Sequence, residues 1–353
     1  MNRYWNFVVA TVLMAAVAIG SAFAEPSKNF KVFLCFGQSN MSGGAGVTPQ
    51  SEDTKTNPRI FTLAFGSCQG WTDNNWGLAK EPLHCGDNVG AMGPAFAFGK
   101  AMTDSLPDDT IGLIPCGLYS RPIEIFMKNG NNMGSGGPIP GWDQKGTNVY
   151  TWMLNKCKKA QERGVFTGII LHQGESNSGQ QDWCTKVKTI YDDLKEDLSL
   201  DHDFPLVAGE LLYSGCCGGH NDIIKNIPTT LPLGYVASAQ GLSGGGSLPQ
   251  YHFNQAGYRT MGQRMAVEMM KGIHEVEKVK ATQPTPRHRI ISATTATTQN
   301  TAAAVYTLNG KLISNSTGLA SKTRSAMRPG NMYIVVNKAT GTSAKLMMAP
   351  TVR

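Results

Sequence analysis

Acidic residues are absent from the end of this chain, since no Asp or Glu follows Glu277. The stretch from Lys280 to Arg353 carries 10 of the 32 Lys and Arg residues, which leaves 22 basic residues against all 25 acidic residues in the part before. The first part is therefore slightly acidic and the tail strongly basic. Such a break in charge predicts two units with different roles.

Long apolar runs are also missing, with one exception near the N-terminus. There Arg3 precedes the run Phe7–Ile19, and Ala22-Phe23-Ala24 follows it. The run is short for a membrane span and no charged stop-transfer flank follows, which favours a signal peptide over a membrane anchor. We therefore expect residues 1–24 to be a signal peptide, the mature protein to be secreted or at the cell surface, and no membrane span in the rest.

Paired CxxC spacings are absent as well, so the 8 Cys residues do not indicate a structural zinc site. An even number of Cys in an exported protein suggests some disulfides, but the spacing does not give their pairing. Cys35 and Cys116 lie in apolar, strand-like runs and are candidates for free core thiols. Neither a metal nor a cofactor is expected.

What the chain does contain is an alternation of apolar runs and helical patterns over residues 25–279. Apolar runs separated by helical patterns predict a parallel sheet with helices on both faces. The expected strands are Lys31–Phe36, Thr110–Cys116, Gly168–His172, Pro205–Leu212 and Gly234–Ala239. The expected helices are Gly93–Met102, Tyr150–Gln161, Lys186–Leu198 and Gly257–Val279.

The composition changes after residue 279. Residues 280–303 are rich in Thr, Ala and Pro, which predicts a linker without a core of its own. Residues 304–353 are expected to form a small basic β module. In it, Ala304–Leu308 and Lys311–Ile313 flank an Asn309-Gly310 turn, which is a hairpin signal, and Met332–Val336 and Ala344–Met348 are two further strand candidates.

Three polar segments lie where an open α/β sheet builds its site, just past strand ends or before the last helix. They are residues 37–41 (GQSNM), residues 172–177 (HQGESN) and residues 252–254 (HFN). Each alone has an ordinary structural explanation, such as a turn or N-cap serine, a solvated glutamate or a packed histidine. Together they supply a nucleophile, a base, an orienting acid and an oxyanion donor: Ser39, His252, Glu175 and Gln173.

The order GQSNM, HQGESN and HFNxAGxR resembles the SGNH (GDSL-like) hydrolases, and more narrowly carbohydrate esterase family six and the sialate O-acetylesterases. The stretches Trp76–His84, Gly93–Phe98 and Ile111–Cys116 are similar to that family too, and the resemblance spans about residues 28–278. It implies a flavodoxin-like three-layer α/β/α fold. It also implies ester hydrolysis, commonly of acetyl groups on xylan or sialic acid.

The resemblance assigns Ser39 as nucleophile and His252 as base. The oxyanion would then face the Ser39 N–H, Gln173 and a backbone N–H near Ser120 or Gly93, with Gln38 and Asn40 as further binding residues.

Two positions depart from the family pattern. Pro249 stands where most relatives carry an Asp three residues before the histidine, so Glu175 becomes the candidate acid, and a backbone carbonyl is the alternative. Tyr119-Ser120-Arg121 replaces the usual Gly-Gly-Thr. The Ser120 N–H can still donate, but the bulky and charged neighbours would narrow the pocket or change its charge.

The expected function is a carbohydrate O-acetylesterase that acts on a xylan-type polysaccharide. The alternatives are a sialate O-acetylesterase and, because of Pro249, a non-catalytic glycan-binding protein on a degenerate scaffold. Candidate pocket walls are Trp71, Trp76, Tyr119, Arg121 and the loop 216–220.

The basic tail resembles a sorting domain of the type IX secretion system, so secretion machinery is an expected partner. A carbohydrate-binding module is the alternative, although Tyr306 and Tyr333 are its only aromatic residues. No nucleic-acid partner is expected, since no reading motif is present.

Overall fold

The computed structural model describes residues 26–84, 91–130 and 148–282, together with four strands further along the chain, 302–307, 312–317, 332–337 and 343–347. The chain divides into two compact units, Met1–Lys278 and Val279–Arg353. The predicted signal peptide and most of the predicted linker lie outside the described residues. Both remain predictions.

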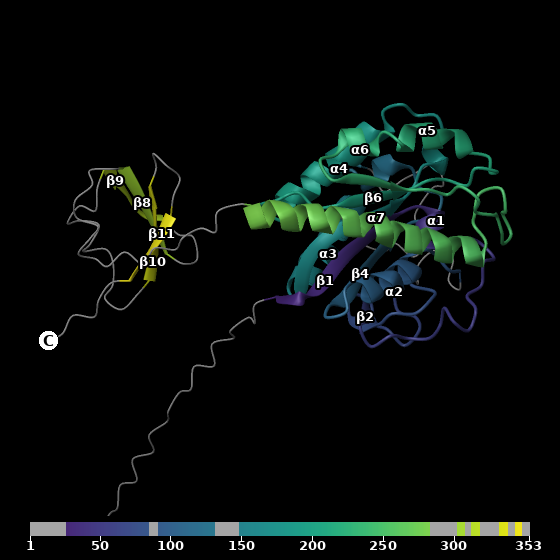
Figure 1. Ribbon diagram of the computed structural model, residues 1–353, viewed down its shortest axis with the longest axis horizontal. Coiled ribbons are helices and arrows are strands. Elements are labelled where there is room, and N and C mark those ends of the chain that lie inside the picture. The colour runs from purple at the N-terminus through teal and green to yellow at the C-terminus, as the bar shows by residue number, and fades with distance from the viewer. Residues whose placement is uncertain are drawn as a thin grey trace, which may run out of the picture. The chain divides into compact units, whose positions relative to one another are not determined.

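The first unit is built on a seven-stranded sheet with the strand order β3-β2-β4-β1-β5-β6-β7 (Figure 1). All neighbours are parallel except β3, which is antiparallel to β2 at the edge. The run β4-β1-β5-β6-β7 has the flavodoxin-like order, in which the chain changes direction across the sheet at β1. The strands are β1 (Ser27–Gly37), β2 (Ile60–Leu63), β3 (Trp76–Leu78), β4 (Thr110–Gly117), β5 (Gly164–His172), β6 (Leu206–Gly209) and β7 (Gly234–Ala237).

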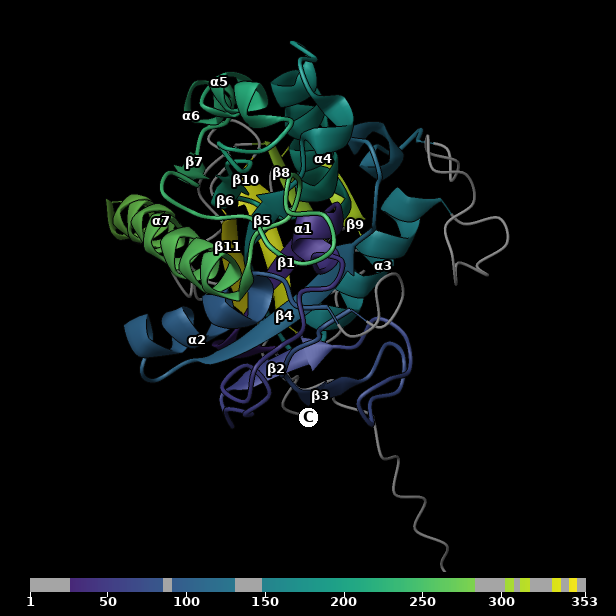
Figure 2. The ribbon, with the colours of Figure 1, turned by 90° about the vertical axis from the view of Figure 1, so that its right-hand side faces the viewer.

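Helices cover both faces of this sheet (Figure 2). α2 (Ala95–Ser105) and α7 (Gln255–Thr282) pack on one face, and α3 (Val149–Gln161) and α4 (Trp183–Asp197) on the other. This confirms the predicted three-layer α/β/α fold. The shorter helices are α1 (Ser39–Ser42), α5 (Asn221–Ile224), α6 (Ile227–Thr230), η1 (Ile123–Phe126), η2 (Glu175–Asn177) and η3 (Gly218–His220).

The core consists of two apolar layers, one on each side of the sheet. Along β1, Val32 and Leu34 belong to the layer under α3 and α4, while Phe33 and Cys35 belong to the layer under α2 and α7. Successive side chains of a strand point to opposite faces, so a strand buried on both sides reads as one continuous apolar run. Cys35 and Cys116 are buried free thiols, as expected, and burial raises the pKa of Cys116 to about 12.

Some elements differ from the prediction in extent or were not predicted. The last helix continues to Thr282, which is beyond the predicted end of the domain, and β6 is shorter than the apolar run that predicted it. The strands β2 and β3, at one side of the sheet, were missed. They contain 4 and 3 residues, too few for an alternating pattern to stand out.

The second unit contains a four-stranded antiparallel sheet in the order β11-β10-β8-β9. Its strands overlap the four predicted from the sequence. They are β8 (Ala302–Thr307), β9 (Leu312–Thr317), β10 (Met332–Asn337) and β11 (Ser343–Met347).

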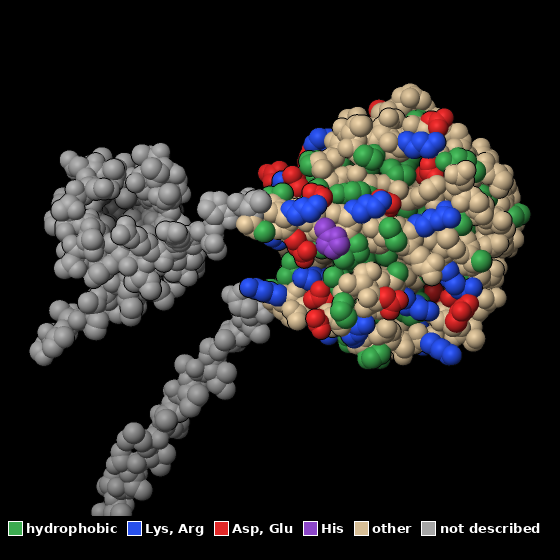
Figure 3. All heavy atoms as spheres, in the orientation of Figure 1, with side chains coloured by type: hydrophobic (Ala, Val, Ile, Leu, Met, Phe, Trp, Pro, Cys, Tyr) green, Lys and Arg blue, Asp and Glu red, His purple; other side chains and the backbone are tan. Residues whose placement is uncertain are grey.

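Within the described residues, no helix has both the length and the apolar character that a membrane span requires. On the face of the first unit along α7, basic and acidic side chains are interspersed (Figure 3). That face does not present the continuous basic stripe on which a nucleic-acid backbone binds.

Candidate active site

The site lies where β1 and β5 end side by side, at the switch point of the sheet. Gly37 at the end of β1 pairs with His172 at the end of β5. Gly37 has φ +145°, and a Cβ atom there would overlap the His172 carbonyl, so glycine is required for this close approach. The chain then continues from β1 into α1 and from β5 into η2, which brings two of the predicted polar segments together.

Ser39 and His252 form a hydrogen-bonded pair. Ser39 is in the first turn of α1, His252 is in the loop before α7, and Ser39 Oγ lies 2.9 Å from His252 Nε2. Burial lowers the pKa of His252 to about 4, so the imidazole is neutral at pH 7 and Nε2 can accept the serine proton. The arrangement fits a nucleophile beside its general base.

Glu175 opens η2, and its carboxylate is held by Asn40. Asn40 Nδ2 donates to Glu175 Oε1, and burial raises the pKa of Glu175 to about 7. Glu175 Oε2 and His252 Nδ1 are both buried without a hydrogen-bond partner among the described residues. The structure therefore pairs Glu175 with Asn40, and a direct role of Glu175 as the acid that orients His252 stays a prediction.

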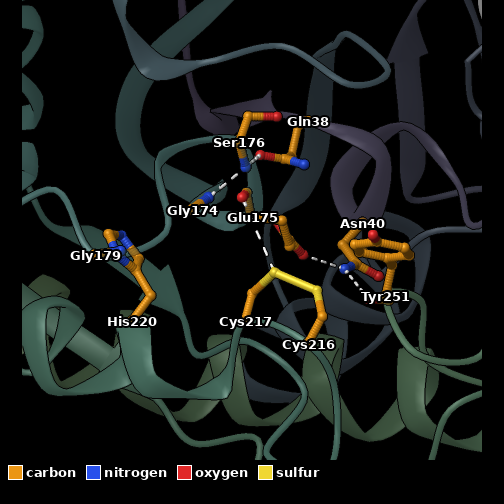
Figure 4. Close-up of a disulfide and its surroundings, with 10 residues drawn as sticks. All are labelled: Gln38, Asn40, Gly174, Glu175, Ser176, Gly179, Cys216, Cys217, His220 and Tyr251. Carbon is orange, nitrogen blue, oxygen red and sulfur yellow. Dashed lines mark hydrogen bonds between the residues drawn. A yellow bond between two sulfur atoms is a disulfide. The ribbon is translucent and has the colours of Figure 1, made fainter.

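The Asn40 side chain is fully engaged. Its Nδ2 donates to Glu175 and, at 2.9 Å, to the Tyr251 carbonyl (Figure 4). Its Oδ1 accepts from the Tyr258 hydroxyl at 2.6 Å. Both amide hydrogens thus face protein acceptors. In this arrangement Asn40 has no side-chain N–H left for a substrate oxygen.

The Gln173 side chain is equally engaged, although it was predicted as an oxyanion donor. Its Nε2 faces Gln38 Oε1 at 3.0 Å, the Arg121 carbonyl at 3.3 Å and Asn177 Oδ1, and its Oε1 accepts from Trp183 Nε1. Gln38 Oε1 also accepts from the Ser176 N–H at 3.1 Å. Gln38 Oε1 and Gln173 therefore connect the ends of β1 and β5, and the amide nitrogen of Gln173 faces protein acceptors.

The remaining predicted donors are backbone groups. The opening N–H groups of a helix have no intrahelical partner, so the Ser39 N–H is free of the α1 ladder. Ser120 is exposed and has φ 54° in the loop after β4. The Gly93 N–H instead faces the buried Glu81 carboxyl, whose pKa is raised to about 8 by burial.

Three residues that hold the site were not recognised in the sequence as polar partners: Tyr258, Trp183 and Asn177. Tyr258 and Trp183 have the apolar spacing of core residues on their helices. Only the contacts of their O–H and N–H groups reveal the additional role.

The candidate pocket walls separate into near and distant residues. The Tyr119 ring centroid is 5.9 Å from that of His252, so Tyr119 lies beside the base. Trp76 packs on Phe30, near the opposite end of β1, with ring centroids 5.1 Å apart. The structure therefore places Trp76 away from the Ser39–His252 pair.

A disulfide between adjacent residues lies against the site. Cys216 and Cys217 are bonded to each other, and the Cys217 sulfur is 4.0 Å from the Glu175 carbonyl (Figure 4). The Cys216 N–H donates to the Gln250 carbonyl at 3.0 Å, two residues before His252. This pairing could not be read from the spacing of the Cys residues.

No cluster of three or more His, Cys, Asp or Glu side chains suited to a metal ion occurs in the described part of the chain.

Residues 29–271 match the family model described as carbohydrate esterase, sialic acid-specific acetylesterase. The chain belongs to this family. It is thus a member of a family of carbohydrate acetylesterases, which are hydrolases of ester bonds, and the catalytic role of the Ser39–His252 pair stays a prediction. The finer expectations, family six membership and the sorting domain, are not part of this match.

Similar proteins agree with the family. A protein of Arabidopsis thaliana named as a probable carbohydrate esterase is 25% identical over 236 residues, which are 60% of this chain and 80% of that protein. A crystal structure of an Arabidopsis thaliana protein has a TM-score of 0.55 at 20% identity and covers 70% of this chain and 100% of its own. The structure titled NanS has a TM-score of 0.55 at 16% identity, with 71% and 99% covered. At these identities the two structures support the fold alone.

Proposed function

We propose that this protein is an exported carbohydrate O-acetylesterase that removes acetyl groups from a xylan-type polysaccharide through an acetyl-enzyme on Ser39. The observation that carries the proposal is the hydrogen bond between Ser39 Oγ and His252 Nε2. It lies at the switch point of the sheet, in a chain of the carbohydrate acetylesterase family.

The proposed reaction has two halves. Ser39 Oγ attacks the acetyl carbonyl while its proton moves to His252 Nε2, and the resulting oxyanion faces the Ser39 N–H and the Ser120 N–H. His252 then gives the proton to the departing sugar oxygen, which leaves acetyl-Ser39. Water, deprotonated by His252, attacks this ester and releases acetate.

Acetate release from acetylated xylan and from an aryl acetate tests the proposal. Ser39→Ala should abolish turnover, because the acetyl-enzyme cannot form. Ser42→Ala is the matched control, since Ser42 is also buried in α1 and its Oγ donates to the Ser39 carbonyl at 3.5 Å. Near-full activity of Ser39→Ala would sink the assignment.

Sialate O-acetylesterase is the second candidate, and the description of the matching family favours it. Acetylxylan and O-acetylated sialic acid, compared side by side through kcat/KM, distinguish the two. A preference for the sialic acid ester of more than about tenfold, or about 1.4 kcal/mol in transition-state binding, would replace xylan as the substrate class. A non-catalytic glycan-binding role predicts no acetate from either.

For the second unit we propose a role in export, as an address for a type IX secretion machinery. Its four-stranded sheet and its basic residues, without any acidic residue, support a separate role from the esterase unit. Expression of the whole chain and of a version without residues 279–353 in a host with that machinery tests it. Equal export of both would contradict the proposal, and loss of polysaccharide binding would favour a binding module instead.

A further inference from the structure

The Asn40 side-chain amide connects the two segments that carry the catalytic pair. Asn40 follows Ser39 in α1, and it is 0% exposed. One of its N–H groups binds the carbonyl of Tyr251, the residue before His252, and the other binds Glu175. The position of the imidazole relative to the Ser39 hydroxyl therefore depends on where this amide is held.

Tyr258 fixes the orientation of that amide. Its hydroxyl, on α7, donates to Asn40 Oδ1 at 2.6 Å, and the Tyr258 side chain is 0% exposed. On the opposite side of the amide lie the Glu175 carboxylate and the Tyr251 carbonyl, which are both acceptors. A flipped amide would place its oxygen against both of them, so only the orientation that Tyr258 supports satisfies every group.

Glu175 reaches the catalytic pair only through Asn40 in this structure. A direct triad would pair a Glu175 oxygen with His252 Nδ1. Instead, Glu175 Oε1 accepts from Asn40, while Glu175 Oε2 and His252 Nδ1 have no hydrogen-bond partner among the described residues. The buried carboxylate is thus placed to hold Asn40 rather than the imidazole.

We propose that Asn40, oriented by Tyr258, is the positioning residue that sets His252 against Ser39, and that Glu175 acts on the pair through Asn40. The proposal rests on the esterase function for its reaction, but it does not depend on which sugar carries the ester. The Cys216–Cys217 loop supports it, because it contacts the Glu175 carbonyl on one side and the Gln250 carbonyl on the other.

Removal of one hydroxyl tests the orientation of Asn40. Tyr258→Phe should lower kcat by about ten- to a hundredfold and change KM by less than about twofold, because the substrate still binds while the pair is misaligned. Tyr191→Phe is the matched control: this hydroxyl is also buried in a helix and donates to the Phe204 carbonyl at 3.0 Å. A kcat of Tyr258→Phe within about twofold of the wild type overturns the proposal.

Two substitutions of Glu175 separate an indirect role from a direct one. Glu175→Gln keeps an oxygen that can accept from Asn40, so kcat should fall by only about two- to fivefold and the part of the acid limb that belongs to His252 should not move. Glu175→Leu removes the acceptor and should cost about a hundredfold. A direct triad acid predicts a different result, since amide replacement there costs about 10⁴ in kcat. A loss of that size in Glu175→Gln overturns the proposal.

The rate at which a fluorophosphonate labels Ser39 separates this proposal from the esterase function. In labelling, Ser39 Oγ bonds to phosphorus, its proton moves to His252 and fluoride leaves, so the rate reports the alignment of the pair without an acetyl ester. Tyr258→Phe should slow labelling by about the same factor as kcat.

Acetate release and fluorophosphonate labelling together distinguish a failure of the esterase function from a failure of the positioning role. Slowed labelling of Tyr258→Phe in a protein that releases no acetate from any tested ester contradicts the function and supports the positioning role. Equal labelling of wild type and Tyr258→Phe contradicts the positioning role alone. No labelling of the wild type contradicts both.

Discussion

Two clusters of polar side chains meet at the ends of β1 and β5, and they differ in how completely they are paired. Around Gln173, the amide nitrogen faces Gln38 and Asn177 and the oxygen accepts from Trp183. Around His252, the imidazole Nδ1 and Glu175 Oε2 are buried without a partner among the described residues. Buried polar groups are normally hydrogen-bonded, and a catalytic role is one of the explanations for an exception. We infer that the Gln173 cluster is structural and the His252 cluster reactive.

The largest effect that distinguishes the clusters is expected on activity. His252→Gln should reduce kcat by about 10³-fold or more, because it removes the base while most of the fold is unaffected. The thermal midpoint should change little, since the imidazole loses only its hydrogen bond to Ser39 Oγ and its Nδ1 has no partner among the described residues. Acetate release and thermal denaturation measure the two quantities.

His220→Gln is the control for this substitution. The His220 side chain is also buried, its Nδ1 accepts from the Gly179 N–H at 3.2 Å, and burial lowers its pKa to about 4. A loss of kcat in His220→Gln as large as that in His252→Gln would show that any buried histidine gives the effect.

The next effect is on stability, and it should appear in the other cluster. Gln173→Leu leaves the buried Trp183 N–H without its acceptor and removes one of the two donors to Asn177 Oδ1, which keeps the Ile123 N–H; this should lower the free energy of unfolding by about 1–3 kcal/mol. Urea denaturation monitored by tryptophan fluorescence measures it. Gln181→Leu, at an exposed glutamine that donates to the Gly179 carbonyl, should cost less than about 0.5 kcal/mol. Equal stability of the two variants would contradict the structural role of Gln173.

The sequence predicted the reactive cluster better than the structural one, for a physical reason. Ser39 lies just past a buried strand and His252 just before the last helix, which are the places where an open α/β sheet builds its site, so the two segments taken together could be expected to meet. The partner of an amide depends instead on contacts between distant residues. Asn40 binds groups that are 135 and 211 positions away, so the sequence indicated a polar residue near the site without indicating which acceptors it faces.

Buried aromatic residues with a polar group show the same limit of prediction from sequence. Tyr258 on α7 and Trp183 on α4 have the spacing of core residues, so their burial is consistent with the sequence pattern. Whether such a side chain also donates a hydrogen bond is decided by what lies opposite it in the folded chain. The strands β2 and β3 were missed for a different reason, which is their small length.

A third prediction concerns the pH dependence of the reactive cluster. The pKa of His252 is lowered from its usual value to about 4 by burial, so the neutral base should persist when the pH falls through 6.5. At pH 5 about nine tenths of the imidazole would be neutral, against about 3% for an unperturbed histidine, which is roughly a thirtyfold difference in rate. The acid limb of kcat/KM against pH should therefore lie near 4.

The pKa of Glu175, raised to about 7, adds a second and smaller inflection, which Glu175→Gln should remove. An acid limb near 6.5 in the wild type would show that the free enzyme solvates the imidazole and that burial does not set its pKa.

The smallest effect is expected from the Cys216–Cys217 disulfide, which touches the reactive cluster only through backbone groups. A disulfide stabilises a fold mainly by restricting the unfolded chain, and the restriction grows with the length of the closed loop. These two residues are adjacent, so the loop is minimal and the double variant Cys216→Ser/Cys217→Ser should keep nearly the same free energy of unfolding. Its kcat should fall by about two- to fivefold, because the loop loses one restraint between Glu175 and Gln250.

Treatment of this double variant with dithiothreitol is the control, because Cys68 is also disulfide-bonded and reduction of the wild type acts on both bonds. If reduction slows the wild type but not the double variant, the effect belongs to the Cys216–Cys217 bond. A large fall in stability with unchanged kcat would reverse the argument, since the disulfide would then stabilise the fold and leave the alignment of His252 to Asn40 and Tyr258 alone.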